Sequence, residues 1–188
     1  MYQRLLQDAS FLALLLHMDD ELCGEARSAG CPLCGAALHS ARFPRKPRGG
    51  PWPVGEEHAS RLSLCCAREG CRKRVTPPTV RFLGRRVYLG AVVALAGVML
   101  SGPTPWRVSR LGKLLGVSRR TLVRWRTWWR ETLPATALFR ELRGRLRGPV
   151  GEGELPGDLL ARLGGDAAAR LVALLRLLCP LSAAGHAR

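Results

Sequence analysis

Two clusters of cysteines constrain this chain more than any other feature of its sequence. The first cluster is the motif CPLCG, in which Cys31 and Cys34, with two residues between them, can bind one metal ion through their thiols. The second contains Cys65, Cys66 and Cys71, with a glycine directly before the last cysteine. Four thiolates close the tetrahedral shell of zinc and leave no position for water. The spacing therefore predicts one structural Zn²⁺ in a small zinc ribbon of short antiparallel strands.

The second cluster leaves one ligand open. If residues 61–66 form a strand, Leu62, Leu64 and Cys66 share one face, which slightly favours Cys66 as the partner of Cys71. Cys65 stays as the alternative. The predicted metal ligands are therefore Cys31, Cys34, Cys71 and either Cys66 or Cys65.

Four further residues are of types that can bind metal, but we expect each of them to have a structural or surface role. His39 and His58 are spare candidates that we interpret as ordinary surface histidines. Cys23 and Cys179 stand alone in the sequence, and we expect both to serve in packing. We expect a cytoplasmic protein, in which seven cysteines suggest a metal site before they suggest disulfides.

The positive charge of the chain is concentrated in its middle. The formal net charge is +16, and residues 40–90 hold 12 basic and 3 acidic residues while residues 104–147 hold 12 and 2. A hydrophobic fraction of 47% excludes wholesale disorder. A compositional bias toward arginine would spread evenly along the chain, so this placement predicts a surface that faces a polyanion.

The stretch after Cys71 alternates basic with β-branched residues. This pattern predicts the last strand of the ribbon with a charged outer face. The alternative is a solvated face that only keeps the module soluble. The basic residues that could line up along a phosphate backbone are Arg72, Lys73, Arg74, Arg81, Arg85 and Arg86.

A helix-turn-helix pattern follows. An apolar run from Tyr88 to Leu100 predicts a buried helix, and Thr104 with the proline after it predicts the capped start of a second helix, which runs to Leu115. Residues 116–118 predict a tight turn that ends on a serine cap, and a third helix runs from residue 119 to about 130. The inward-facing side chains are predicted to be Val108, Leu111, Leu114 and Leu115 on the second helix, Val117 in the turn, and Leu122, Trp125 and Trp129 on the third helix.

The third helix is predicted to read the major groove of DNA. Arginines near the start of such a helix can pair two donors with guanine, while others bind phosphates. A trihelical unit that binds protein, with a merely solvated basic helix, is the alternative. The predicted DNA-binding residues are Ser118, Arg119, Arg120, Thr121, Arg124, Arg126, Lys113 and Arg110, together with Arg72, Lys73 and Arg74 of the basic stretch.

These motifs resemble the N-terminal region of bacterial insertion-sequence transposases, in which a zinc ribbon precedes a helix-turn-helix. The resemblance rests on CPLCG at Cys31, CRKRVTPP at Cys71 and VSRRTLVRW at Val117, and it spans about residues 31–130. It implies binding to the terminal DNA of a mobile element, with Cys31, Cys34, Cys66 and Cys71 as ligands and Arg119 to Arg124 in recognition.

The catalytic core of such transposases has no counterpart in this sequence. That core holds two magnesium ions with three carboxylates, and the six acids after residue 130 do not lie in strand-like contexts. We therefore expect a non-catalytic protein that binds double-stranded DNA, without a small-molecule substrate or membrane, associated with a bacterial nucleoid. A chromosomal transcription regulator and an RNA- or polymerase-binding zinc-ribbon adaptor are the alternatives.

The expected fold class is α+β and mostly α. Its parts are an N-terminal helix (1–24), the zinc ribbon with a basic Pro/Gly-rich insert (25–86), the helix-turn-helix (87–132) and a C-terminal helical segment (133–188). The helix at 166–178 is apolar nearly all round, which predicts burial within the chain or in a homodimer.

Overall fold

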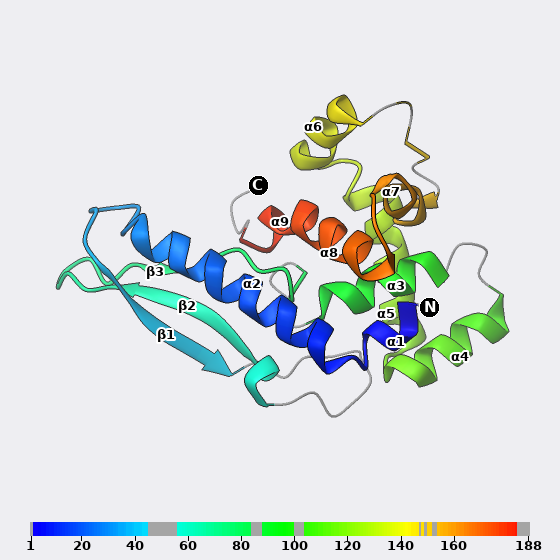
Figure 1. The fold of residues 1–188 in the computed structure, drawn as a ribbon, viewed down its shortest axis with the longest axis horizontal. Coiled ribbons are helices and arrows are strands. Elements are labelled where there is room, and N and C mark those ends of the chain that lie inside the picture. The colour runs from blue at the N-terminus through cyan, green and yellow to red at the C-terminus, as the bar shows by residue number, and fades with distance from the viewer. Residues whose placement is uncertain are drawn as a thin grey trace.

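In the computed structural model the described residues are 2–44, 56–83, 88–99, 104–146, 148, 150–151 and 154–183. The chain is α+β and mostly helical, as its sequence predicts, and the ribbon is drawn in Figure 1. The α-helices are α1 (Tyr2–Leu5), α2 (Ala9–Ser28), α3 (Gly90–Met99), α4 (Pro105–Leu115), α5 (Arg119–Thr127), α6 (Ala137–Arg145), α7 (Gly157–Arg162), α8 (Ala167–Leu178) and α9 (Pro180–Ala183).

The strands form one small antiparallel sheet in the order β1-β2-β3. Strand β1 (Leu38–Pro44) pairs with β2 (Ser60–Cys66) so that Leu38 lies opposite Cys66, and a 3₁₀ turn (Glu56–Ala59) leads into β2. The long helix α2 lies beside β2 (Figure 1). Its first turn is capped by Asp8, whose carboxylate accepts hydrogen bonds from the backbone N–H groups of Ser10 and Phe11.

The third strand is much shorter than its sequence predicts. Strand β3 covers only Arg74–Val75, and beyond it the chain leaves the sheet. Pro77 and Pro78 lie directly on this path, and a proline cannot donate to a sheet. Residues 79–82 are instead buried between the sheet and the helices.

The other helices gather around α3, which is buried along most of its length. Helices α4, α5 and α8 all contact α3, and α1 contacts α8. The large core therefore joins residues from Leu6 to Cys179, so the expected boundaries at 86/87 and 132/133 do not separate hydrophobic cores. Helix α8 buries Leu171, Leu174, Leu175 and Leu178 in this core, as the apolar pattern of residues 166–178 predicts.

Helix α5 does not continue as regular α-helix to about residue 130, where its sequence predicts its end. Regular α-helix ends at Thr127, and a π-helical turn follows over Trp128–Thr132, where the N–H of Leu133 donates to the carbonyl of Trp128 at 2.8 Å. The wider turn accompanies complete burial of Trp129, whose indole N–H donates to the carbonyl of Val93 at 3.1 Å.

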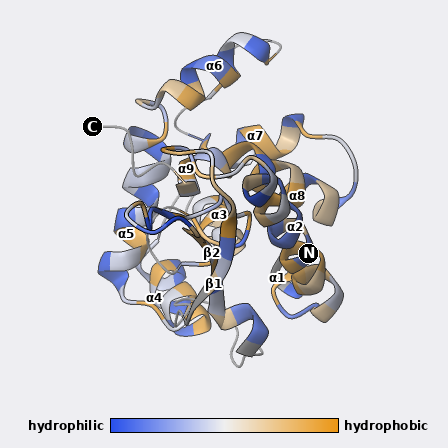
Figure 2. Cartoon of the chain, turned by 90° about the vertical axis from the view of Figure 1, so that its left-hand side faces the viewer, coloured by the Kyte–Doolittle hydropathy of each residue, from blue (hydrophilic) through white to orange (hydrophobic). Residues whose placement is uncertain are grey.

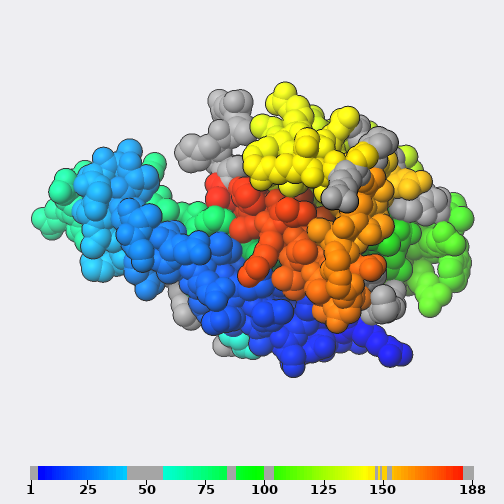
Figure 3. Space-filling model, turned by 45° about the horizontal axis from the view of Figure 1, so that its top comes forward, coloured from blue at the N-terminus to red at the C-terminus, as the bar shows by residue number. Residues whose placement is uncertain are grey.

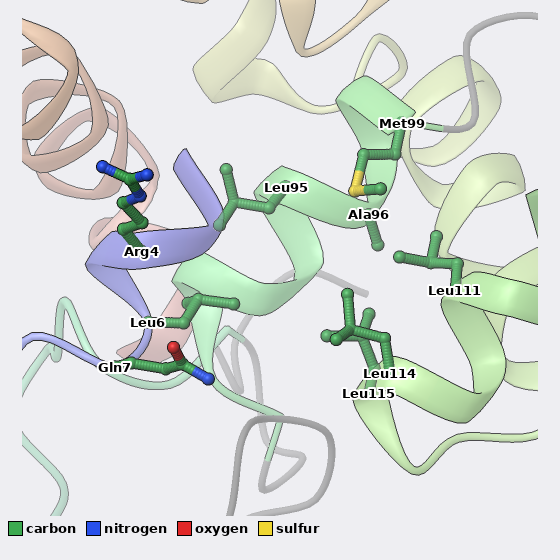
Figure 4. Close-up of a pocket in the computed structure, with 9 residues that line it drawn as sticks. All are labelled: Arg4, Leu6, Gln7, Leu95, Ala96, Met99, Leu111, Leu114 and Leu115. Atoms are coloured by element: carbon green, nitrogen blue, oxygen red, sulfur yellow. The ribbon is translucent and has the colours of Figure 1, made fainter. Parts of the chain in front are cut away.

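Leu114 is not one of the inward-facing residues, contrary to the prediction. Its side chain is 46% exposed, whereas Leu111 and Leu115, one turn apart, fill the core side of α4. Figure 4 shows why: Leu114 borders an apolar hollow of about 170 Å³ between α1, α3 and α4, with Met99 across from it. Val117 is half-buried rather than buried.

Candidate metal centre and candidate nucleic-acid surface

The cysteine cluster lies at one end of the molecule, in a lobe that projects from the helical body (Figures 1 and 3). Cys31 follows the end of α2, and its N–H donates to the carbonyl of Ala36 at 2.9 Å. Gly30, with φ +74°, makes this turn possible, because a Cβ there would lie 2.9 Å from the carbonyl oxygen of Gly35. The turn folds Cys34 back toward Cys31.

Cys66 and Cys71 come from the end of β2 and the turn after it. The N–H of Cys66 donates to the carbonyl of Lys73 at 2.9 Å, and the N–H of Cys71 donates to the carbonyl of Arg68 at 3.2 Å. Gly70, with φ +83°, lies inside this turn, which explains a glycine directly before the last cysteine.

The thiols of Cys31, Cys34, Cys66 and Cys71 all lie within 4.8 Å of one another. Two of the Sγ–Sγ separations are 3.7 Å, from Cys31 to Cys71, and 3.5 Å, from Cys34 to Cys66. Four sulfurs at the usual zinc–thiolate distance of about 2.3 Å would be about 3.8 Å apart in a regular tetrahedron. The size of the cluster and its soft donors therefore fit a four-thiolate metal centre.

Cys66, and not Cys65, belongs to this cluster. The thiol of Cys65 lies 3.8 Å from the carbonyl oxygen of Cys66 and 3.7 Å from that of Arg72, on the other face of the strand. The alternation that favoured Cys66 in the sequence is therefore the alternation that the strand displays.

The surroundings shift the pKa values of two of the clustered thiols in opposite directions. The backbone N–H of Leu33 donates to the sulfur of Cys31 and lowers the pKa of that thiol to about 7. Burial raises the pKa of the Cys66 thiol to about 12. A metal ion would therefore meet one thiol that ionises readily and one that must give up its proton to the metal.

The two histidines lie outside the cluster, and the prediction that both are surface residues is wrong for one of them. His39 is exposed, as expected, but His58 is only 8% exposed. It lies in the 3₁₀ turn that leads into β2, and its carbonyl accepts a hydrogen bond from Arg81 at 3.3 Å. Cys23 and Cys179 are both buried, in agreement with packing roles.

Helices α4 and α5 present the second candidate site. They lie side by side at one edge of the view in Figure 2. The turn between them has Gly116 in the left-handed conformation, and the Ser118 hydroxyl accepts the N–H of Thr121 at 3.3 Å. The predicted DNA-binding residues that are exposed here are Ser118, Arg119, Arg120, Arg124, Arg110 and Lys113, whereas Arg126 is half-buried.

Thr121 does not have the outward position that its predicted contact with the DNA groove requires. Its side chain is buried at 8% exposure, and its hydroxyl lies 3.1 Å from the hydroxyl of Ser118. The same oxygen accepts a hydrogen bond from Arg124 at 3.4 Å, and Arg124 also donates to the hydroxyl of Tyr88 at 3.1 Å. Thr121 and Tyr88 therefore orient Arg124, and Thr121 does not face outward beside it.

Two exposed apolar residues on these helices were missed by sequence reasoning. Trp106 on α4 is 65% exposed, with the guanidinium of Arg110 5.2 Å from its ring centre. Val123 on α5 is 53% exposed. Helical periodicity could have found Val123, because it lies three residues after Arg120 and four before Thr127, on the outer face.

The basic stretch after Cys71 divides between surface and core. We call the lobe that holds the four clustered cysteines the metal end. Arg72, Lys73 and Arg74 are exposed there, and in Figure 1 this lobe lies at the opposite end of the long axis from α4. Arg81 is not a surface residue, contrary to the prediction: it is 3% exposed, and its Nε lies 2.6 Å from a carboxylate oxygen of Asp19. Residues 85 and 86 lie outside the described part of the chain.

No protein-family model, curated protein or solved structure matches this chain. In the described part of the chain, no helix combines the length and apolar character that crossing a membrane requires.

Proposed function

We propose that this chain is a zinc-dependent protein that binds double-stranded DNA, with α4 and α5 forming a helix-turn-helix and α5 entering the major groove. The observation that carries the proposal is the division of α5 into two faces. Leu122 and Trp125 are buried against the helical body, while Arg119, Arg120 and Arg124 stand outside. A rigid helix that offers arginines to the outside matches the way such helices read guanine in the groove.

The hydrogen bonds of Arg124 add to this proposal. Arginine carries several rotatable bonds, and ordering it on binding costs entropy. The bonds to Tyr88 and Thr121 hold the guanidinium before DNA arrives. A preorganised side chain of this kind is favoured where direction matters, as it does in base recognition.

Zinc has a structural part in the proposal. Cys31, Cys34, Cys66 and Cys71 would hold one ion and fix the two turns at the metal end, from which Arg72, Lys73 and Arg74 would contact phosphates. When bound, the ion would supply four metal–thiolate links and no catalysis, because the four sulfurs fill its shell. We propose further that the protein is non-catalytic and derives from, or assists, a mobile element of the insertion-sequence type.

Selection from a random duplex pool at about 150 mM salt tests the proposal, with zinc measured on the same sample. We expect enrichment of a defined site, one zinc per chain, and loss of the enrichment on chelation. If one zinc stays bound and the pool shows no enrichment, sequence-specific DNA binding is refuted.

A pair of variants tests the role of α5. Arg119→Ala with Arg124→Ala should abolish sequence preference. Arg140→Ala with Arg176→Ala removes the same charge from exposed positions on α6 and α8, and this control should keep the preference. Equal preference in both variants would show that another surface reads the DNA.

A further inference from the structure

The outer face of α5 is not uniformly charged, because it carries one large apolar side chain. Val123 is 53% exposed, whereas its apolar neighbours Leu122 and Trp125 are 0% and 5% exposed. Valine is also a weaker helix former than most residues, since its branched side chain loses rotamer freedom in a helix. Neither core packing nor helix stability accounts for a valine at this position.

The surroundings of Val123 are cationic and polar. Arg119 and Arg120 lie one turn before it on the same face, and Thr127 lies one turn after it. The next residue, Arg124, is directed toward Tyr88 by its hydrogen bond. Helix α5 contains no acidic residue. Val123 is therefore an apolar spot surrounded by side chains suited to a polyanion.

The major groove of DNA offers one apolar group to such a spot, the C5 methyl of thymine. We propose that Val123 is a specificity-determining residue that contacts a thymine methyl, beside a guanine bound by Arg120 or Arg124. A valine in a helix has essentially one rotamer, so the contact costs little side-chain entropy. The inference rests on the proposed function and adds to it the base that α5 prefers.

Deoxyuridine tests this contact, because it lacks only the methyl group of thymine and keeps every hydrogen-bonding group of the base. Each thymine of the selected site is replaced in turn by deoxyuridine, and affinity is measured for the wild-type protein and for Val123→Ala. At one position we expect the wild type to lose about threefold to tenfold in affinity, as burial of one methyl implies. At that position Val123→Ala should bind both duplexes equally.

Two further variants guard against other causes. Val123→Thr keeps the branched shape and one methyl, and it should keep part of the preference for thymine. Leu14→Ala removes another exposed apolar side chain, 45% exposed on α2, and this variant should keep the full preference for thymine. Thermal unfolding and zinc content show that each variant is folded.

The outcomes separate this inference from the proposed function. If no duplex is enriched, the proposed function fails. If a site is enriched but no thymine methyl matters, or if Val123→Ala keeps the full deoxyuridine penalty, only the role of Val123 is overturned.

Discussion

The metal end and the helical body of this chain hold themselves together by different means. The metal end has a small cluster of buried residues, Cys23, Cys31, Leu38, Leu64 and Cys66. The helical body has a continuous apolar core that includes Val92, Trp129, Phe139, Leu171 and Leu174. Because small apolar clusters supply little stability, we expect the metal end to depend on a bound ion for its stability and the body to be stable without one.

A buried ion pair joins the two regions. The carboxylate of Asp19 on α2 accepts hydrogen bonds from Arg81 Nε at 2.6 Å and from the N–H of Val80 at 2.7 Å. The same arginine donates to the carbonyl of Ser60 at 2.9 Å, at the first residue of β2. One residue therefore connects α2, the strand and the segment that leads to the body.

Loss of a metal ligand should have the largest effect and should be confined to one region. Cys34→Ser should release the ion and, with it, stabilisation on the order of 10 kcal/mol. Amide hydrogen exchange should then accelerate over residues 31–44 and 60–75, while α3 and α8 keep their protection. Cys65→Ser is the matched control and should keep zinc. If α3 and α8 lose protection as well, the two regions are not independent.

Breaking the junction should come next in size. Asp19→Asn leaves the buried guanidinium of Arg81 without its counter-ion, which should lower the free energy of unfolding by about 3–5 kcal/mol. Chemical denaturation measures the change. Asp20→Asn, on the exposed side of the same helix, should change it by less than about 0.5 kcal/mol. An equal, small effect of both substitutions would contradict the role assigned to the pair.

The charges at the metal end should act on affinity and not on sequence preference. Arg72→Ala with Lys73→Ala removes two exposed cations, and it should weaken binding uniformly across duplex sequences. The slope of log affinity against log salt should become shallower by about 2. Measurements over a series of salt concentrations, on the selected site and a scrambled one, check this. A changed preference would mean that the metal end also reads bases.

The smallest expected effect concerns pH. Burial lowers the pKa of His58, the negative charge of Glu57 opposes this in part, and the positive charge of Arg81 adds a smaller lowering. The unfolded chain then takes up a proton near the ordinary value of about 6.5, before the folded chain does. This contribution to stability is therefore present above that pH and is lost below it. Between pH 7.5 and pH 5.5, the free energy of unfolding should therefore fall more in the wild type than in His58→Gln.

The sequence predicted what short-range signals encode. Thr104 and Ser118 cap helices where expected, Gly116 makes the predicted turn, and strand alternation favoured Cys66, which lies in the cluster. These features depend on residues a few positions apart, so local geometry is enough to find them.

Other features depend on contacts that no local pattern contains. Asp19 and Arg81 are 62 residues apart in the chain, and only the folded sheet and helices bring them together. The burial of Thr121 likewise follows from how α5 rests on the body, and the π-helical turn from the space that Trp129 fills.

The position of Ser182 in the chain has a consequence for the order of events during synthesis. Its hydroxyl accepts the N–H of Thr79 at 2.7 Å, and its carbonyl accepts Arg61 at 2.7 Å, so α9 closes over the base of the metal end. All four clustered cysteines have left the ribosome well before residue 182 is made. The metal end can therefore fold early, as a separate unit, before α9 is made and packs against it.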